Sequence, residues 1–201
     1  MSARGRFITI EGGEGTGKST LIGGLRESEA FADTLFTREP GGSPGAEELR
    51  ALLVTGETGR WDALTELLLI NAARRDHVLR TVEPALAAGR AVVCDRYLDS
   101  TRAYQGARGV ERDLIDRIHA MAVGLSPDRT ILLDAPPGTG LARAGARRGP
   151  DRFERMDAAF HEDLRAAFLA IARQEPGRVT TIDATRPARA VLADALEALS
   201  C

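Results

Sequence analysis

Lysine occurs only once in this chain, where a glycine-rich segment meets a predicted helix. Of the 27 lysine and arginine residues, 26 are arginine and the remaining one is Lys18. Residues 12–19 read Gly-Gly-Glu-Gly-Thr-Gly-Lys-Ser, which matches the pattern Gly-x-x-x-x-Gly-Lys-Ser. An ammonium group is a compact point charge that reaches phosphate oxygens without the planar fork of a guanidinium. The segment therefore predicts a loop that binds the phosphates of a nucleotide.

The glycines of this loop leave backbone N–H groups free to converge on phosphate, in conformations that a Cβ would block. We expect Lys18 to reach the β and γ phosphates of ATP and the Ser19 hydroxyl to ligate Mg²⁺. The N-terminus of the following helix adds its dipole. The predicted nucleotide-binding residues of the loop are Gly12, Gly13, Gly15, Thr16, Gly17, Lys18, Ser19 and Thr20. A glycine turn that matches the pattern by coincidence is the alternative, and the motif alone indicates nucleotide binding rather than one reaction.

Two further strand ends carry charged residues that suit a second phosphate. Asp95 ends an apolar strand, where it can approach the Mg²⁺ shell, and Arg96 follows it toward the same crevice. Arg38 follows the strand at 34–37 and could converge with Arg96 on a phosphate that the loop does not hold, because two guanidinium forks suit a dianion. The alternatives are a surface Asp-Arg pair at 95–96 and, after Arg38, a plain turn with a helix beginning near Pro44.

These residues lie in an alternation of short apolar runs and longer stretches whose apolar spacing suits helices. We predict a single α/β domain over residues 1–201, with a parallel sheet covered by helices on both faces. The predicted strands are 7–10, 34–37, 91–95, 129–134 and 179–183. The predicted helices are 19–30, 61–88 with a kink at Pro84, 157–175 and 187–199. Segments 38–45 and 143–155 are predicted loops or lids.

Composition narrows the class of protein. A net charge of −2 and a hydrophobic content of 43% are typical of a globular protein with no overall field for nucleic acid or anionic lipid. Cys94 and Cys201 form neither a metal-binding spacing nor a disulfide framework. We therefore expect a cytoplasmic protein that binds neither nucleic acid nor membrane.

Taken together, the loop at 12–19, Arg38-Glu39-Pro40-Gly41-Gly42, and Asp95-Arg96-Tyr97-x-x-Ser100 followed by Ala103-Tyr104-Gln105-Gly106 resemble thymidylate kinase. The resemblance runs from the first strand through the late helices. It implies a three-layer P-loop nucleoside-monophosphate-kinase fold with a five-stranded parallel sheet. It also implies transfer of the ATP γ-phosphoryl group to dTMP in the presence of Mg²⁺, and a homodimer.

The same resemblance assigns roles to residues that spacing alone does not identify. It places Arg38 and Arg96 on the dTMP phosphate, Arg74 on a thymine carbonyl and Glu14 on the deoxyribose 3′-hydroxyl. Tyr104 lies where a ring would crowd a ribose 2′-hydroxyl, and Ser100, Thr101 and Gln105 read the pyrimidine edge. One position departs from the family: Ile70 stands where the family usually has an aromatic ring that stacks on thymine. The implied substrate-binding set is Glu14, Arg38, Ile70, Arg74, Arg96, Ser100, Thr101, Tyr104 and Gln105.

Segment 143–155 carries five arginines among 13 residues and resembles the lid of the bacterial-type enzymes. Gly15 occupies a loop position where one branch of the family has an arginine, so transition-state charge must be met from elsewhere. We expect Arg147 to be that arginine, with Arg143 and Arg148 on the ATP phosphates. The predicted catalytic residues are Lys18, Asp95, Arg96 and Arg147, and the predicted metal ligands are Ser19 and Asp95. A solvated basic helix or a nucleic-acid patch is the alternative for this segment.

Two other functions remain open at this point. A kinase for another nucleoside monophosphate is the nearer one, because Ile70 changes the base site. A nucleotide-gated switch or remodelling ATPase is the second, although it would leave the arginines at 38 and 96 without a role.

Overall fold

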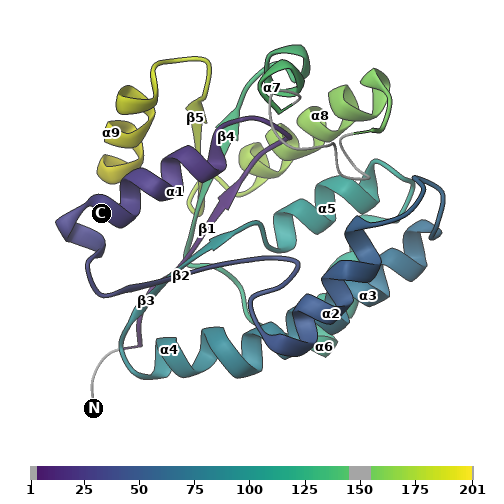
Figure 1. The fold of residues 1–201 in the computed structure, drawn as a ribbon, viewed down its shortest axis with the longest axis horizontal. Helices are drawn as coiled ribbons and strands as arrows, with labels where there is room; N and C mark the ends of the chain where they lie inside the picture. The colour runs from purple at the N-terminus through teal and green to yellow at the C-terminus, as the bar shows by residue number, and fades with distance from the viewer. Residues whose placement is uncertain (1–3, 145–154, 201) are drawn as a thin grey trace.

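The computed structural model describes residues 4–144 and 155–200 and has a five-stranded parallel sheet at its centre (Figure 1). The strands are β1 (Phe7–Glu11), β2 (Thr34–Arg38), β3 (Ala91–Asp95), β4 (Arg129–Asp134) and β5 (Val179–Asp183). Their spatial order is β2-β3-β1-β4-β5, and all four neighbouring pairs are parallel. The predicted α/β fold with five parallel strands is confirmed, and β1 and β2 each extend one residue beyond the prediction.

The side chains of each strand alternate between two hydrophobic layers. Ile8 and Ile10 of β1 pack with α1 (Lys18–Glu27) and α9 (Ala188–Leu199), which cover one face of the sheet. Phe7 and Val92 point to the opposite face and pack against the helices that follow β2 and β3. The sheet is therefore buried on both sides, which explains why its strands read as nearly continuous apolar runs.

The second face is covered by a larger group of helices: α3 (Ala63–His77), α4 (Glu83–Ala87), α5 (Leu98–Gly106), α6 (Arg112–Ala122) and α8 (Ala158–Gln174). The helix α2 (Pro44–Val54) packs on α3. The short α7 (Pro137–Ala144) follows β4 and packs on α8.

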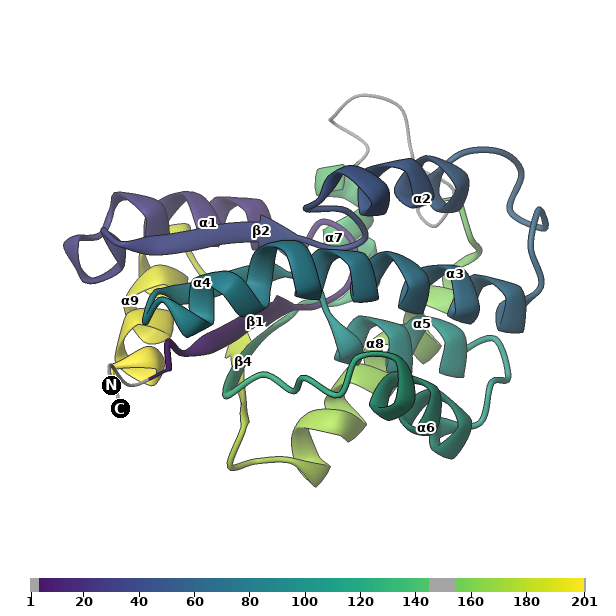
Figure 2. The same cartoon turned by 90° about the horizontal axis from the view of Figure 1, so that it is seen from below.

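A long helical region at 61–88 is also confirmed, in three parts. A π-helical turn at Val78–Val82 joins α3 to α4, so the three form one rod (Figure 2). Pro84 lies in the first turn of α4. Because Pro84 has no N–H to donate, the helix accommodates it beside this widened turn.

Two predicted boundaries were wrong. Segment 38–45 is a loop only as far as Ser43, because Pro44 begins α2 with its φ already suited to a first helical position. The helix at 19–30 begins at Lys18, ends at Glu27 and is followed by a 3₁₀ turn at Glu29–Phe31. Segment 143–155 lies almost wholly outside the described residues. Within the part that the structure describes, no helix has the length and apolar content needed to span a bilayer.

The strand order decides where the chemistry can take place. β3 lies between β1 and β2, and Asp95 is in register with both Ile10 and Arg38. The carboxyl ends of three strands therefore meet at one edge of the sheet, where the loops after β1, β2 and β3 begin.

Candidate functional site

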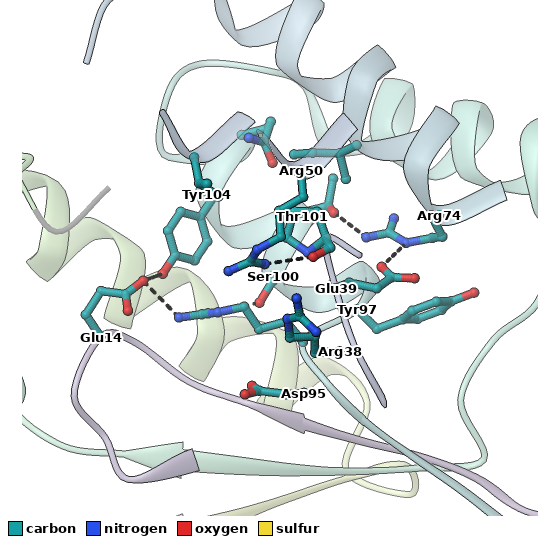
Figure 3. Close-up of a pocket in the computed structure, with 15 residues that line it drawn as sticks. Glu14, Arg38, Glu39, Arg50, Arg74, Asp95, Tyr97, Ser100, Thr101 and Tyr104 are labelled. Atoms are coloured by element: carbon teal, nitrogen blue, oxygen red, sulfur yellow. Dashed lines mark hydrogen bonds and ion pairs between the residues drawn. The ribbon is translucent and has the colours of Figure 1, made fainter. Parts of the chain in front are cut away.

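One pocket above this edge gathers the predicted substrate residues (Figure 3). It encloses about 770 Å³, part of it open to solvent. All nine residues of the predicted substrate-binding set line it, and so does Asp95. Glu14 and Tyr104 lie at one end of the pocket and Arg74 and Glu39 at the other, with Ser100 and Thr101 between them.

The glycine-rich loop lies beside this pocket. Lys18 follows the loop as the first residue of α1. Gly17 precedes α1 with φ 94°, a left-handed conformation that favours glycine. The buried Nζ of Lys18 donates to the carbonyl oxygens of Gly12 at 3.0 Å and Gly13 at 2.8 Å. Burial, reinforced by the charge of Arg96, lowers the pKa of Lys18 to about 8. The positive charge of the ammonium is therefore only partly compensated, so it can bind anionic phosphate oxygens.

The outer side of the same loop borders a second pocket. Gly15, Thr16, Gly17 and Thr20 line it opposite the residues that follow β5, from Ala184 to Ala188 and including Arg186. It offers about 1000 Å³, again partly open to solvent. Ser19 is exposed in the first turn of α1. The loop therefore separates two hollows that share one wall.

Gly15 is also where the loop touches α7. A Cβ at Gly15 would stand 1.8 Å from the carbonyl oxygen of Gly140, and Gly15 has φ 66°. In the reverse direction, a Cβ at Gly140 would stand 2.2 Å from the carbonyl oxygen of Glu14. An arginine at position 15 therefore has no room in this arrangement.

Arg96 connects the loop with the substrate pocket. Its guanidinium donates to the carbonyl oxygen of Gly12 at 2.9 Å, to the Ser100 hydroxyl at 3.2 Å and to Glu14 Oε1 at 2.8 Å. The Tyr104 hydroxyl donates to the same Glu14 oxygen. Burial alone would raise the pKa of Glu14, but Arg96, Lys18 and Tyr104 hold it at about 2. Burial would lower the pKa of Arg96, but Glu14 above all raises it, so the pair stays charged.

Glu11, which the sequence analysis did not identify, supports this turn from below. Arg96 has φ 67°, a conformation that costs energy for any residue with a Cβ. The fully buried carboxylate of Glu11 accepts from the Tyr97 N–H at 2.8 Å and the Ser100 hydroxyl at 2.5 Å. Burial and the nearby Asp99 raise the pKa of Glu11 to about 7. These bonds fix the strained turn that aims Arg96.

Arg38 stands at the mouth of the substrate pocket. It donates to Glu47 Oε2 at 2.9 Å, and its side chain is 49% exposed. The other oxygen of Glu47 accepts from the Gly42 N–H at 2.9 Å. Because this ion pair is exposed, little free energy holds the guanidinium there, and it can turn toward an entering anion.

Arg74 is buried at the far end of the pocket. Its Nε donates to Glu39 Oε2 at 2.7 Å and its NH2 group to the Thr101 hydroxyl at 2.8 Å. Within the described residues its third nitrogen, NH1, has no hydrogen-bond partner. Glu39, to which the sequence analysis gave no role, accepts a hydrogen bond from His77 Nδ1 at 3.0 Å on its other oxygen. These hydrogen bonds fix the Arg74 side chain and leave its NH1 group as a donor for a ligand.

Gln105 lies one turn after Thr101 on α5, so both face the same side. Its Nε2 donates to Glu66 Oε2 at 3.3 Å, whereas its Oε1, buried as well, has no partner among the described residues. Asp95 likewise has an Oδ1 that is buried without a hydrogen bond in the described part of the chain. Ile70 is partly buried in the pocket wall.

Two lining residues, Arg50 and Val54, belong to no motif that the sequence analysis used, and Pro40 belongs to one but received no role. Arg50 reaches the pocket from α2, where it donates to the Pro40 carbonyl at 2.7 Å. An arginine on the helix that follows Arg38 is a sequence signal for anion binding. Arg50 reaches the pocket only because the turn at 39–43 brings α2 close to it. The lid assignments at Arg147 and Arg148 fall outside the described residues, as does the side chain of Arg143.

Comparison with known proteins points in one direction. The family model described as thymidylate kinase matches residues 10–195. Thymidylate kinase of Ruegeria pomeroyi is 51% identical over 201 residues, covering 98% of this chain and 95% of that protein. That of Caulobacter vibrioides is 53% identical over 194 residues, covering 94% and 93%. The crystal structure of thymidylate kinase from Ehrlichia chaffeensis superposes with a TM-score of 0.79 at 30% identity, covering 98% and 99%.

Proposed function

The chain belongs to the thymidylate kinase family and phosphorylates dTMP to dTDP with ATP, and we propose that its two pockets divide this reaction between acceptor and donor. The substrate pocket around Arg96 takes dTMP, and the hollow outside the glycine-rich loop takes ATP. Lys18 lies at the boundary, where the transferred phosphoryl group crosses. We further propose that residues 1–201 act as one kinase domain with a lid at about 143–155, working in the cytoplasm.

The acceptor phosphate binds between Arg38 and Arg96. Arg96 is preorganised by Glu11 and Glu14, whereas Arg38 is held only by an exposed pair with Glu47. One fixed and one adjustable guanidinium can grip a dianion from two sides and hold it in line for attack on the γ phosphate. Positioning and charge neutralisation, with no covalent intermediate, account for the transfer.

The base site is complementary to the edge of thymine. The leftover donor of Arg74 and the leftover acceptor of Gln105 come from neighbouring helices that are linked through Thr101. Thymine offers an acceptor at O4 and a donor at N3, and cytosine offers the reverse pair. A buried donor and acceptor left unpaired by the wrong base cost far more than the right base gains, so dTMP is favoured over dCMP.

The sugar binds at the other end of the pocket. The ionised Glu14 carboxylate can accept the deoxyribose 3′-hydroxyl, and the Tyr104 ring crowds the position of a ribose 2′-hydroxyl. Ile70 packs on the base by dispersion, without the extra ~0.5–1.5 kcal/mol that an aromatic pair supplies. The buried edge contacts must then carry more of the base recognition than in relatives with a stacking ring.

Mg²⁺ suits the oxygen donors that remain beside Lys18. The Asp95 carboxylate has a buried oxygen without a partner in the described chain, and the Ser19 hydroxyl is exposed at the start of α1. Such hard oxygen ligands, supplemented by phosphate and water, are what Mg²⁺ prefers. The ion would neutralise charge on the ATP phosphates; Arg143 and Arg148 would add to it from the lid.

We expect ATP affinity to fall above about pH 8. The ammonium of Lys18 has a pKa of about 8 before ATP binds, and the phosphates of ATP raise it again, so binding at higher pH takes up a proton. Calorimetric titrations with ATP should show affinity dropping by up to about tenfold per pH unit beyond that point. Proton uptake, read from buffers of different ionisation enthalpy, should rise in parallel. Constant affinity up to about pH 9.5 would contradict this account.

A homodimer is part of the proposal. Leu64, Leu68 and Leu79 lie along the α3–α4 rod with side chains that are 45%, 54% and 45% exposed. A second copy of the chain, packed against this stripe, would bury them. Sedimentation should give twice the mass of one chain, and Leu68→Arg should give a monomer; a monomer for both proteins would reject the dimer.

The acceptor itself is tested by an ADP-release assay with dTMP, dUMP, dCMP, dGMP and AMP. The donor–acceptor pair at Arg74 and Gln105 carries the preference for dTMP over dCMP. A clear preference for any other acceptor would overturn it.

A further inference from the structure

Gln105 can recognise N3–H of thymine only if its amide presents oxygen, not nitrogen, to the base. The two ends of a primary amide have almost the same shape and opposite hydrogen-bonding character. A free glutamine could rotate and accept cytosine instead. The selectivity of the pocket therefore depends on whatever fixes the orientation of this amide.

Glu66 on α3 is placed to fix it. Its side chain is fully buried, and its Oε2 receives Gln105 Nε2 at 3.3 Å. A carboxylate accepts hydrogen bonds and donates none, so turning the amide around would bring two acceptors together inside the protein. Gln105 then has only its Oε1 left to offer, and that oxygen is unpaired within the described residues.

Arg108 in turn fixes Glu66. Its NH1 group lies 2.5 Å from Glu66 Oε1, and its NH2 group donates to the Trp61 carbonyl at 2.9 Å. Burying a carboxylate is costly unless it is paired, and Arg108 provides the pairing cation away from the base. The order Trp61–Arg108–Glu66–Gln105 runs from the loop before α3 to the pocket wall.

We propose that Glu66 and Arg108 are positioning residues that hold the Gln105 amide with its oxygen toward the base, and so set the preference for dTMP over dCMP. This inference rests on the proposed function. Neither residue touches substrate; each acts through the next along the chain of contacts.

Glu66→Gln tests the proposal with an almost isosteric change. Arg108 can pair only with the oxygen of the new amide, which leaves the amide nitrogen facing Gln105. Gln105 should then reverse and present its N–H to the base, where it repels N3–H of thymine and suits N3 of cytosine. We expect the ratio of kcat/KM for dTMP to that for dCMP to fall by about tenfold or more, mainly through KM for dTMP. The KM for ATP should stay within about twofold of the wild-type value.

The exchange variant Glu66→Gln/Gln105→Glu provides a rescue. The amide at position 66 donates to a carboxylate at 105, which offers the base an acceptor whichever way it turns. The preference for dTMP should return. Because the same groups are present in exchanged positions, this variant also decides the matter should Glu66→Gln fold poorly.

Glu175→Gln is the matched control, since Glu175 also pairs with arginines (Arg102, Arg112 and Arg178) but does not line the pocket. Its dTMP to dCMP ratio should equal that of wild type. A folded Glu66→Gln that keeps the wild-type ratio, or an exchange variant that fails to restore it, overturns the inference. A wild-type enzyme without preference for dTMP would instead reject the proposed base site.

Discussion

Arg96→Ala is expected to lower kcat/KM for dTMP by about a thousandfold. Arg96 makes three hydrogen bonds that join the glycine-rich loop, the proposed 3′-hydroxyl acceptor Glu14 and α5. Its removal takes one guanidinium from the proposed acceptor-phosphate site and leaves Glu14 buried without its main cation. The acceptor is then misaligned as well as weakly bound, so both KM and kcat should suffer.

Steady-state kinetics with dTMP as the varied substrate provide the readout, and calorimetry with ATP alone separates the two pockets. ATP should bind Arg96→Ala within about threefold of wild type, because Lys18 and the outer hollow remain. Arg173→Ala, at an exposed position on α8, serves as the control and should have wild-type rates. A loss of less than about tenfold for Arg96→Ala would remove Arg96 from the proposed acceptor site.

Arg147→Ala is expected to lower kcat by about a thousandfold or more with little change in substrate binding. Negative charge spreads over the phosphoryl oxygens in the transition state, and an arginine that meets it acts on rate rather than affinity. The packing of Gly15 against Gly140 leaves the glycine-rich loop no room for such a side chain. The proposed lid at about 143–155 is the arginine-rich segment that the resemblance assigns to this role.

Comparing Arg147→Ala with Arg152→Ala distinguishes a finger from a general effect of lid charge, since each removes one positive charge from the same segment. We expect the larger loss of kcat at position 147, with dissociation constants for ATP and dTMP within about threefold of wild type. Equal, small losses for both variants would mean that no single lid arginine acts as the finger.

The fold could be predicted largely from sequence because its signals are local. Buried parallel strands read as short apolar runs, and 91–95 and 129–134 were bounded correctly for that reason. The glycine-rich loop is equally local, since its glycines, Lys18 and the helix dipole are adjacent in the chain. The π-helical turn before Pro84 could not be foreseen, because a proline signals a break without specifying how neighbouring residues repack.

The pocket residues also differ in how far the sequence predicts them. Arg38 and Arg96 could be inferred from strand ends, whereas Arg74 and Gln105 came only from the resemblance. Their partners Glu39 and Glu66 lie 35 and 39 residues away in sequence. Glu39 lies in the motif at 38–42, which does not say what its carboxylate binds, and Glu66 lies in no motif at all. The pairing of both residues becomes visible only once the helices are packed. Glu11 was missed for another reason. It is the last residue of β1, whose apolar residues predict a strand but give no role to a glutamate at its end.

The central claim is that two anion sites face each other across one crevice, and a crystal structure with dTMP and a nonhydrolysable ATP analogue tests it most directly. We predict the dTMP phosphate within hydrogen-bond distance of both Arg38 and Arg96, the thymine edge on Arg74 and Gln105, and the γ phosphate on Lys18 Nζ. A dTMP phosphate that contacts neither arginine, with the ATP analogue still seated on Lys18, would contradict the account.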